Sequence, residues 1–302
     1  MKIAVTTSTF AEQDPGPLDL LRANFDEVRL NPHGRTLSAE ETVGFLAGCA
    51  GVLAGTEPYS AELFAARPEL RVVSRCGAGL DSVDLKAAAA KGVAVLNTPD
   101  GPSPAVAELT LALALDLARR ISLHDRNLRN GAWRKRLGRL LAGQQVAVIG
   151  YGRIGRRVAG LFRALGCRVA VCDPYADSGE LPNRPLAELL PCSDGLTLHC
   201  APPPGGPLLG RAELALMKPG AWLINAARGG LVDEEALAEA LAEGRLSGAA
   251  LDVFEREPYQ GPLTGLDTAL LTPHIGSYAR EARIGMEREA AENLLRGLGR
   301  DD

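Results

Sequence analysis

The fold of this chain is decided by residues 144–175, which read QQVAVIGYGRIGRRVAGLFRALGCRVAVCDPY. A short apolar run leads into Gly150, Gly152 and Gly155, a helical pattern follows, and a second apolar run ends at Asp173. This order predicts a dinucleotide-binding unit, because the glycines permit a tight turn, the approach of a pyrophosphate to the backbone and close packing of helix on strand. The N–H groups at the start of the helix then hold the phosphates.

Asp173 lies at the spacing expected for the acid that binds the ribose of a dinucleotide. A carboxylate at this position accepts hydrogen bonds from both ribose hydroxyls and repels a 2′-phosphate. We therefore expect NAD to be preferred over NADP. The alternative is that Asp173 only caps a turn before Pro174.

Strand-like and helix-like segments alternate along almost the whole chain. Segments such as ELTLALALDLARRI (108–121) carry apolar residues at helical spacing. The strand-like segments are short apolar runs at residues 2–7, 51–55, 71–76, 93–97, 145–150, 168–173, 195–200, 221–225, 248–253 and 269–273. Runs that are apolar on both faces are typical of parallel strands covered by helices, so we expect an α/β fold.

The length of 302 residues favours two domains over one. Turn-forming residues interrupt the pattern in NTPDGPSP (97–104) and in EPYQGPLTG (257–265). The last segment, 277–298, has a helical pattern. If this helix returns to the first half, the first domain is discontinuous.

The composition argues against several classes of function. Lys and Arg total 33 and Asp and Glu total 37, and this net charge of −4 argues against a general surface for nucleic acid or membrane. No apolar run reaches the roughly 18 residues of a transmembrane helix, and the N-terminus lacks the pattern of a signal peptide. The six cysteines form no C-x-x-C pair, so we expect reduced thiols, a cytoplasmic protein and no metal site.

Two of the four histidines are candidates for a catalytic base. His33 lies in a turn and His124 at a polar helix end, and we expect both at the surface. His199 ends one apolar run, and His274, in LTPHIGS (271–277), follows another. Because ligands bind at the carboxyl ends of strands in doubly wound sheets, both are eligible, and periodicity does not choose between them.

Arg228 follows the apolar run at 221–225 and lies among small residues. A planar guanidinium in such a place can bind a carboxylate through two hydrogen bonds. The same arginine can instead cap a nearby helix or pair with Asp233 or Glu234.

The stretch LDVFEREP (251–258) places three acids at another strand end, Asp252, Glu255 and Glu257. A glutamate paired with a base histidine would raise the pKa of that histidine and fix its tautomer. We therefore expect one of these acids to accompany the base.

Four motifs in order resemble those of the D-isomer-specific 2-hydroxyacid dehydrogenase family: GYGRIG followed by Asp173, NAARGGLVDEEAL (225–237), GAALDVFEREP (248–258) and LTPHIGS. Residues 74–119 are similar to its phosphoglycerate dehydrogenase branch. The resemblance implies two doubly wound domains, one Rossmann-like and one flavodoxin-like, with the active site in the cleft between them. It implies a substrate-binding domain of residues 1–98 plus 274–302 and an NAD-binding Rossmann domain of residues 99–273.

The resemblance also implies roles for individual residues. His274 would donate and accept the proton, Glu257 would be its partner, and Arg228 would bind the substrate carboxylate. The backbone N–H groups of Ala78 and Gly79 would receive the same carboxylate. The implied contacts to the cofactor are Gly150, Gly152, Arg153, Ile154, Gly155, Asp173, His199, Cys200, Ala226, Arg228, Asp252, His274 and Gly276.

The activity implied by the resemblance is NAD-dependent interconversion of a D-2-hydroxy acid and its 2-oxo acid. The substrate of the phosphoglycerate branch would be 3-phosphoglycerate, but AGTEPYSAE (54–62) carries Glu57 where that branch has a basic stretch. Arg75, or WRKRLGR (133–139) of a neighbouring subunit, would then supply a cation. Glyoxylate, hydroxypyruvate or another small 2-oxo acid is the alternative within the family. A non-catalytic NAD(H)-sensing protein similar to a corepressor is the alternative from another class.

The segment 105–121 is apolar nearly all round, which predicts a helix buried on more than one side. In the family this region forms a two-fold contact. The resemblance therefore implies a homodimer through residues 99–140, with no nucleic-acid or membrane partner.

Overall fold

The structure is a computed structural model that describes residues 1–300. The chain forms two compact units. Unit 1 comprises Met1–Pro102 and the C-terminal segment that starts at Ser277, and unit 2 comprises Ser103–Gly276. Within residues 1–300, no helix combines the length and the apolar character needed to cross a membrane.

Both unit boundaries lie a few residues after the positions expected from the sequence, 98/99 and 273/274. At the first boundary, Gly101 packs so closely on Met286 of unit 1 that an added Cβ would lie 2.4 Å from Met286 Cγ. At the second boundary, the N–H groups of Ile275 and Gly276 donate to the carboxylate of Asp252 in unit 2. His274 therefore belongs to unit 2.

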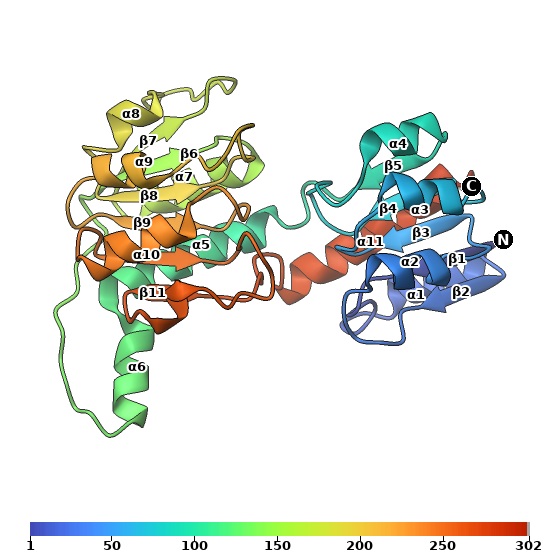
Figure 1. Ribbon diagram of the computed structural model, residues 1–302, viewed down its shortest axis with the longest axis horizontal. Helices are drawn as coiled ribbons and strands as arrows, with labels where there is room; N and C mark the ends of the chain where they lie inside the picture. Colours follow the sequence, from blue (N-terminus) through green and yellow to red (C-terminus); the bar gives the residue numbers. More distant parts are fainter. Residues whose placement is uncertain (301–302) are drawn as a thin grey trace. The chain divides into compact units, whose positions relative to one another are not determined.

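Unit 1 is built on a five-stranded parallel sheet in the order β2-β1-β3-β4-β5, the flavodoxin-like order (Figure 1). Its strands are β1 (Lys2–Val5), β2 (Glu27–Leu30), β3 (Gly51–Ala54), β4 (Val72–Arg75) and β5 (Ala94–Asn97). Its helices are α1 (Gly16–Asn24), α2 (Ala39–Phe45), α3 (Ala61–Ala66), α4 (Leu85–Ala90) and α11 (Arg280–Gly297).

Helices cover both faces of this sheet. Side chains of α1 and α11 form one core with β1, β3 and β4, and side chains of α3 and α4 form a second core on the opposite face. The last helix, α11, lies directly on the strands: Ser74 Oγ donates to the carbonyl of Ala290 at 2.7 Å, and an added Cβ on Gly51 would lie 2.8 Å from Leu294 Cδ1. The two ends of the chain thus build one unit.

Unit 2 is built on a six-stranded parallel sheet in the order β11-β10-β9-β8-β6-β7 (Figure 1). Its strands are β6 (Gln145–Ile149), β7 (Arg168–Cys172), β8 (Gly195–Leu198), β9 (Trp222–Asn225), β10 (Gly248–Leu251) and β11 (Ala269–Leu271). Its helices are α5 (Ser103–Arg119), α6 (Ile121–Arg129), α7 (Arg153–Ala164), α8 (Leu186–Leu189), α9 (Arg211–Leu216), α10 (Glu234–Ala242) and the 3₁₀ helix η1 (Pro262–Gly265). The predicted α/β class, with two parallel sheets covered by helices, is confirmed.

The sheet of unit 2 also has a helix layer on each face. Side chains of α5 and α7 pack on one face, and those of α8, α9 and α10 pack on the other. The chain runs from β6 to β7 on one side and then crosses to β8 on the other side of β6. Ligands of doubly wound sheets bind at such a switch point, outside the carboxyl ends of the strands.

The helix expected over 105–121 ends earlier. Arg120 has a left-handed backbone, with φ of 55°, and separates α5 from α6. Asp116 Oδ1 accepts the N–H of Ser122 at 2.9 Å. This bond satisfies a donor at the start of α6, so the chain breaks the helix there instead of continuing it.

Candidate active site

The glycine loop of unit 2 lies at the switch point between β6 and β8. Gly150 follows β6 with φ of +89°, and an added Cβ would lie 2.6 Å from the carbonyl of His199. On Gly155, in the first turn of α7, an added Cβ would lie 2.0 Å from the carbonyl oxygen of Gly150. Beside Gly152, by contrast, a Cβ would meet nothing within 4 Å. Two glycines permit close packing, and the third leaves open space at the N-terminus of α7.

Asp173 binds the backbone of this loop. Its Oδ2 accepts the N–H of Tyr151 at 2.8 Å, and its Oδ1 accepts the N–H of Tyr175 at 2.9 Å. Burial opposes ionisation, but these N–H donors, with Arg156 nearby, lower the pKa of Asp173 below its usual value. The side chain therefore caps the turn at Pro174 and is also a carboxylate. Each oxygen keeps a lone pair for a further donor.

His199 follows β8, next to Gly150. Thr197 Oγ1 lies 2.9 Å from its Nε2, and its buried Nδ1 has no hydrogen-bond partner among residues 1–300. Burial lowers the pKa of His199 to about 3. The imidazole is therefore neutral and a poor proton acceptor. A buried, unsatisfied nitrogen beside the glycine loop is the kind of group that a polar ligand satisfies.

Glu257, in the segment after β10, and His274, in the segment after β11, form a hydrogen-bonded pair. His274 Nδ1 lies 2.8 Å from Glu257 Oε2, and Glu257 Oε1 accepts the N–H of Phe254 at 3.1 Å. The hydrogen bond from Glu257 raises the pKa of His274 above its ordinary value, although burial acts against it. Burial likewise opposes ionisation of Glu257, but His274 lowers its pKa. The His274 side chain is 49% exposed, and only its Nδ1 is engaged by Glu257.

Asp252 anchors the loop that carries His274. Its Oδ1 accepts hydrogen bonds from the hydroxyl of Thr272 at 2.6 Å and from the N–H of Ile275 at 2.8 Å. Its Oδ2 accepts one from the N–H of Gly276 at 2.7 Å. The side chain is 1% exposed, and burial raises its pKa despite these donors. His274 itself has φ of 54°. Asp252 thus binds the side chain of Thr272 before His274 and the backbone after it, and so holds a residue in a costly conformation.

Arg228 lies in a turn after β9 that buried Asn225 shapes. The Asn225 side chain accepts the N–H of Ala227 at 3.1 Å and donates to the carbonyl of Arg228 at 2.8 Å. Arg228 Nη1 donates to the carbonyl of Ala227 at 2.7 Å. The positive charge of Arg228 lowers the pKa of His274, by less than Glu257 raises it, so the two side chains are within electrostatic reach.

The turn at Arg228 packs directly on the segment that leads to Glu257. An added Cβ on Gly229 would lie 1.9 Å from the carbonyl oxygen of Phe254. The acids proposed as alternative partners of Arg228 hold other groups: Asp233 caps α10 through the N–H of Ala236, and Glu234 accepts the N–H of Glu255. Unit 2 therefore brings Arg228, Glu257 and His274 together on adjoining loops.

The remaining cofactor candidates lie on the same unit. Arg153 and Ile154 open α7, Cys200 follows His199, and Ala226 is 7% exposed at the end of β9. Thr272 was not among the candidates, and Glu234 was considered only as a possible partner of Arg228; the structure adds both through their bonds to Asp252 and Glu255. For Glu234 the sequence carried one signal, its place within the motif NAARGGLVDEEAL, where α10 begins.

The candidates in unit 1 lie at the carboxyl ends of its strands. Ala78 and Gly79 follow β4, and Asn97 Nδ2 donates to the carbonyl of Ala78 at 2.7 Å. Glu57 is 1% exposed and accepts Thr6 Oγ1 at 2.9 Å, and its burial raises its pKa. The guanidinium of Arg75 lies beside Gly77 and donates to the carbonyl of Cys76. Glu57 is thus a sequestered side chain instead of an exposed carboxylate.

The fold and the site define a dinucleotide-binding α/β protein with a histidine–glutamate pair. Residues 111–276 match the NAD-binding domain of one family, and the chain belongs to that family, the D-isomer specific 2-hydroxyacid dehydrogenases. The family predicted from the four motifs is confirmed. The open space at Gly152, the carboxylate of Asp173 and the unsatisfied nitrogen of His199 fit the dinucleotide that such a domain binds.

Named relatives and solved structures agree with this family. The D-3-phosphoglycerate dehydrogenase of Methanocaldococcus jannaschii is 41% identical over 240 residues, which are 76% of this chain and 46% of that protein. The TT0316 protein from Thermus thermophilus superposes with a TM-score of 0.92 at 38% identity over 99% of this chain and 97% of its own. D-lactate dehydrogenase from Aquifex aeolicus, complexed with NAD and lactic acid, has a TM-score of 0.86 at 26% identity over 99% and 96% of the two chains. The chain spans about half the length of the curated relatives it matches.

Proposed function

We propose that this protein is an NAD-dependent oxidoreductase that interconverts a D-2-hydroxy acid and its 2-oxo acid. The observation that carries the proposal is the hydrogen bond of 2.8 Å between His274 Nδ1 and Glu257 Oε2, on a loop next to the turn of Arg228. Family membership and relatives named D-3-phosphoglycerate dehydrogenase support it.

The proposed reaction assigns one task to each of these side chains. NAD, when bound, supplies the centre that gives or takes the hydride. Arg228 binds the substrate carboxylate and orients the carbonyl. Because Nδ1 of His274 is held by Glu257, Nε2 gives a proton to the carbonyl oxygen in reduction and takes one from the hydroxyl in oxidation. Glu257 stabilises the charged imidazole and fixes its tautomer.

The proposed cofactor site is the carboxyl edge of the sheet of unit 2. The phosphates would lie on the glycine loop, and Asp173 would bind the ribose, so we assign NAD as the preferred cofactor over NADP. The residues that would hold the cofactor are Gly150, Gly152, Arg153, Ile154, Gly155, Asp173, His199, Cys200, Ala226, Arg228, Asp252, His274 and Gly276.

Replacing Asp173 by alanine is expected to weaken NADH binding roughly 10- to 100-fold, because a charge-assisted hydrogen bond contributes about 1.5–3 kcal/mol. NADPH is expected to lose less, because the repulsion of its 2′-phosphate disappears with the carboxylate. Fluorescence titration with both nucleotides measures the two affinities. Asp177→Ala, in the loop after Asp173, is the matched control. Unchanged NADH affinity in Asp173→Ala would remove the ribose assignment.

For the substrate we propose a small 2-oxo acid whose carboxylate also receives the N–H groups of Ala78 and Gly79. The sequestered position of Glu57 removes one objection to a phosphorylated substrate, and Arg75 is the cation of unit 1 proposed to bind it. NADH absorbance with a panel of 2-oxo acids, including 3-phosphohydroxypyruvate, glyoxylate and hydroxypyruvate, tests the function. Turnover of one of them is expected, and no turnover on any of them would favour a non-catalytic NAD(H)-binding protein.

We also infer a homodimer through residues 99–140. Apolar side chains on α6 and on the segment after it are exposed, most of all Trp133 at 77% and Leu137 at 96%. Several large exposed apolar side chains within one segment favour a protein–protein interface there. All six cysteines are free thiols, which supports the proposed cytoplasmic location.

Light scattering after size exclusion is therefore expected to give the mass of a dimer. The double substitution Trp133→Glu and Leu137→Glu places two charges in the contact and is expected to give a monomer. Leu216→Glu, on α9 at 55% exposure, is the control and should stay dimeric. A monomeric wild-type protein at micromolar concentration would contradict the inference.

A further inference from the structure

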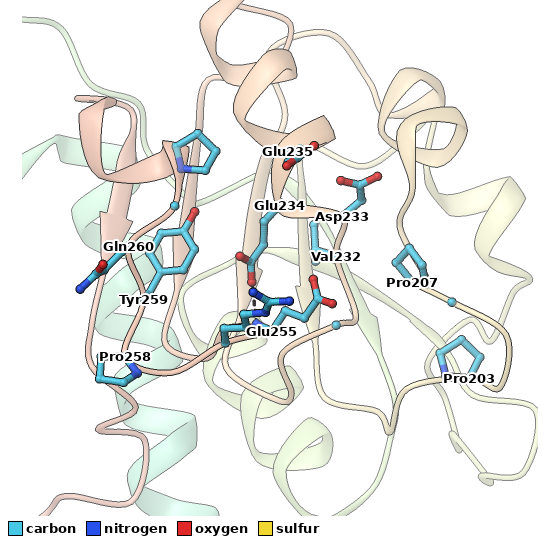
Figure 2. Close-up of a pocket in the computed structure, with 15 residues that line it drawn as sticks. Pro203, Pro207, Val232, Asp233, Glu234, Glu235, Glu255, Pro258, Tyr259 and Gln260 are labelled. Carbon is cyan, nitrogen blue, oxygen red and sulfur yellow. Dashed lines mark hydrogen bonds between the residues drawn. The ribbon is translucent and has the colours of Figure 1, made fainter.

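A cavity of about 1030 Å³ lies in unit 2 beside the segments that carry Arg228 and Glu257 (Figure 2). Gly230 and Pro258, which follow those two residues closely, are part of its wall. Four carboxylates face it, those of Asp233, Glu234, Glu235 and Glu255. Among residues 1–300 no group of acidic, histidine and cysteine side chains is arranged to hold a metal ion.

One of these carboxylates is tied to the backbone of the catalytic segment. Glu234 Oε1 accepts the N–H of Glu255 at 2.8 Å, a bond that Figure 2 shows as a dashed line from the start of α10 to the segment opposite. Burial raises the pKa of Glu234, its hydrogen bond to Glu255 acts against this, and the charges of Glu255, Asp233 and Glu257 add to the rise. The bond fixes the backbone of the segment that leads to Glu257.

The bond leads to the histidine through consecutive contacts. Glu234 accepts the N–H of Glu255. The N–H of the preceding residue, Phe254, donates to Glu257 Oε1 at 3.1 Å. Glu257 Oε2 then holds His274 Nδ1 at 2.8 Å. On the other side, the carbonyl of Phe254 lies against Gly229, next to Arg228. The peptide that Glu234 fixes therefore lies against the substrate-binding turn, and the peptide before it, joined through Phe254, supports the Glu257–His274 pair.

We propose that Glu234 is a positioning residue of the active site: its hydrogen bond to Glu255 sets the place of Glu257 and thereby the alignment of His274. The role rests on the proposed function, because it acts through the pair assigned there to proton transfer. Misplacement of a catalytic group by about 1 Å costs up to 100-fold in rate, so the effect is measurable even though Glu234 touches no reacting atom.

The test compares four variants in the full chain. Glu234→Ala removes the acceptor, Glu234→Asp keeps the charge but shortens the reach, and Glu234→Gln keeps an acceptor oxygen without the charge. Glu235→Gln removes the neighbouring exposed carboxylate and is the control. We expect kcat/KM to fall roughly 10- to 100-fold in the alanine and aspartate variants. We expect it to stay within about threefold of wild type in Glu234→Gln and Glu235→Gln.

A second measurement separates positioning from general damage to the fold. NMR titration follows the imidazole of His274, one of only four histidines, and the His274→Ala spectrum identifies its signal. The charges that act on His274 are those of Glu257, Asp252 and Arg228. We therefore expect its pKa to fall in Glu234→Ala and Glu234→Asp, where Glu257 is displaced, and to stay raised in Glu234→Gln.

The outcomes are distinct. Wild-type kcat/KM and an unchanged His274 pKa in Glu234→Ala would overturn the positioning role, as would equal losses in the alanine and glutamine variants. If Glu234→Ala does not fold, Glu234→Asp carries the same comparison. If the wild-type protein turns over no 2-oxo acid, the proposed function fails, and the His274 titration still decides whether Glu234 positions the pair.

Discussion

His274→Ala is expected to lower kcat about 10³-fold while NADH binding is retained. The substitution removes the proposed proton donor, and positioned acid–base groups contribute 10²–10⁴-fold to rate. His199 is not expected to substitute for it, because burial holds the pKa of His199 at about 3. Steady-state reduction of a 2-oxo acid measures kcat, and a fluorescence titration measures NADH affinity.

His124→Ala, on α6, is the matched control for the loss of a histidine and should keep wild-type kcat.

The pH dependence gives a second check. Reduction needs protonated His274, so kcat/KM in that direction should hold at low pH and fall as the pH rises through the pKa that Glu257 raises. Oxidation needs neutral His274, so kcat/KM in that direction should rise as the pH rises through the same pKa. In Glu257→Gln the negative charge that raises the pKa of His274 is gone, so both pH dependences should shift to lower pH. Retention of more than a few per cent of kcat in His274→Ala would refute the role.

The sheet strands show what a sequence pattern can and cannot predict. The apolar runs predicted the strands buried on both faces, because covering helices leave no polar position on them. The strand β2 was missed. Its sequence, EVRL, carries Glu27 and Arg29, and none of its four residues is buried, because it lies at the edge of the sheet. The other edge strands, β5, β7 and β11, keep apolar runs and were predicted, so the charged residues of β2 are what hid it.

The candidate site likewise has residues that could be predicted from the sequence and contacts that could not. The glycine loop and the strand-end residues could be predicted because their chemistry is written in short local motifs. Between His199 and His274 only the family resemblance chose; the physical difference between them, burial and a partner, depends on segments distant in the sequence. For Asp252 the motif predicted the residue but not its bonds: its carboxylate holds Thr272, Ile275 and Gly276. Glu234 was considered only as a possible partner of Arg228, because its bond to the backbone of Glu255 joins segments that are 21 residues apart in the sequence.

Arg228→Ala is expected to lower kcat/KM for the 2-oxo acid about 10³-fold, on the order of 4 kcal/mol, which is in the range for truncating one partner of a hydrogen-bonded charge pair. Both KM and kcat should suffer, because the same guanidinium binds the carboxylate and orients the carbonyl. Asn225 holds the backbone of the turn through Ala227 and Arg228, so the turn itself should survive the substitution. Steady-state kinetics measures the loss, and thermal unfolding checks the fold.

Arg228→Lys separates charge from geometry. A lysine keeps the positive charge but cannot form the paired hydrogen bonds of a guanidinium, so it should recover only part of the loss. Arg256→Ala removes an exposed arginine from the segment next to Glu257 and should leave kcat/KM nearly unchanged. Full recovery by lysine would mean that charge alone suffices and that paired binding of the carboxylate is wrong. An alanine variant within a few-fold of wild type would mean that the substrate carboxylate is bound elsewhere, and the backbone N–H groups of Ala78 and Gly79 would be the next candidates.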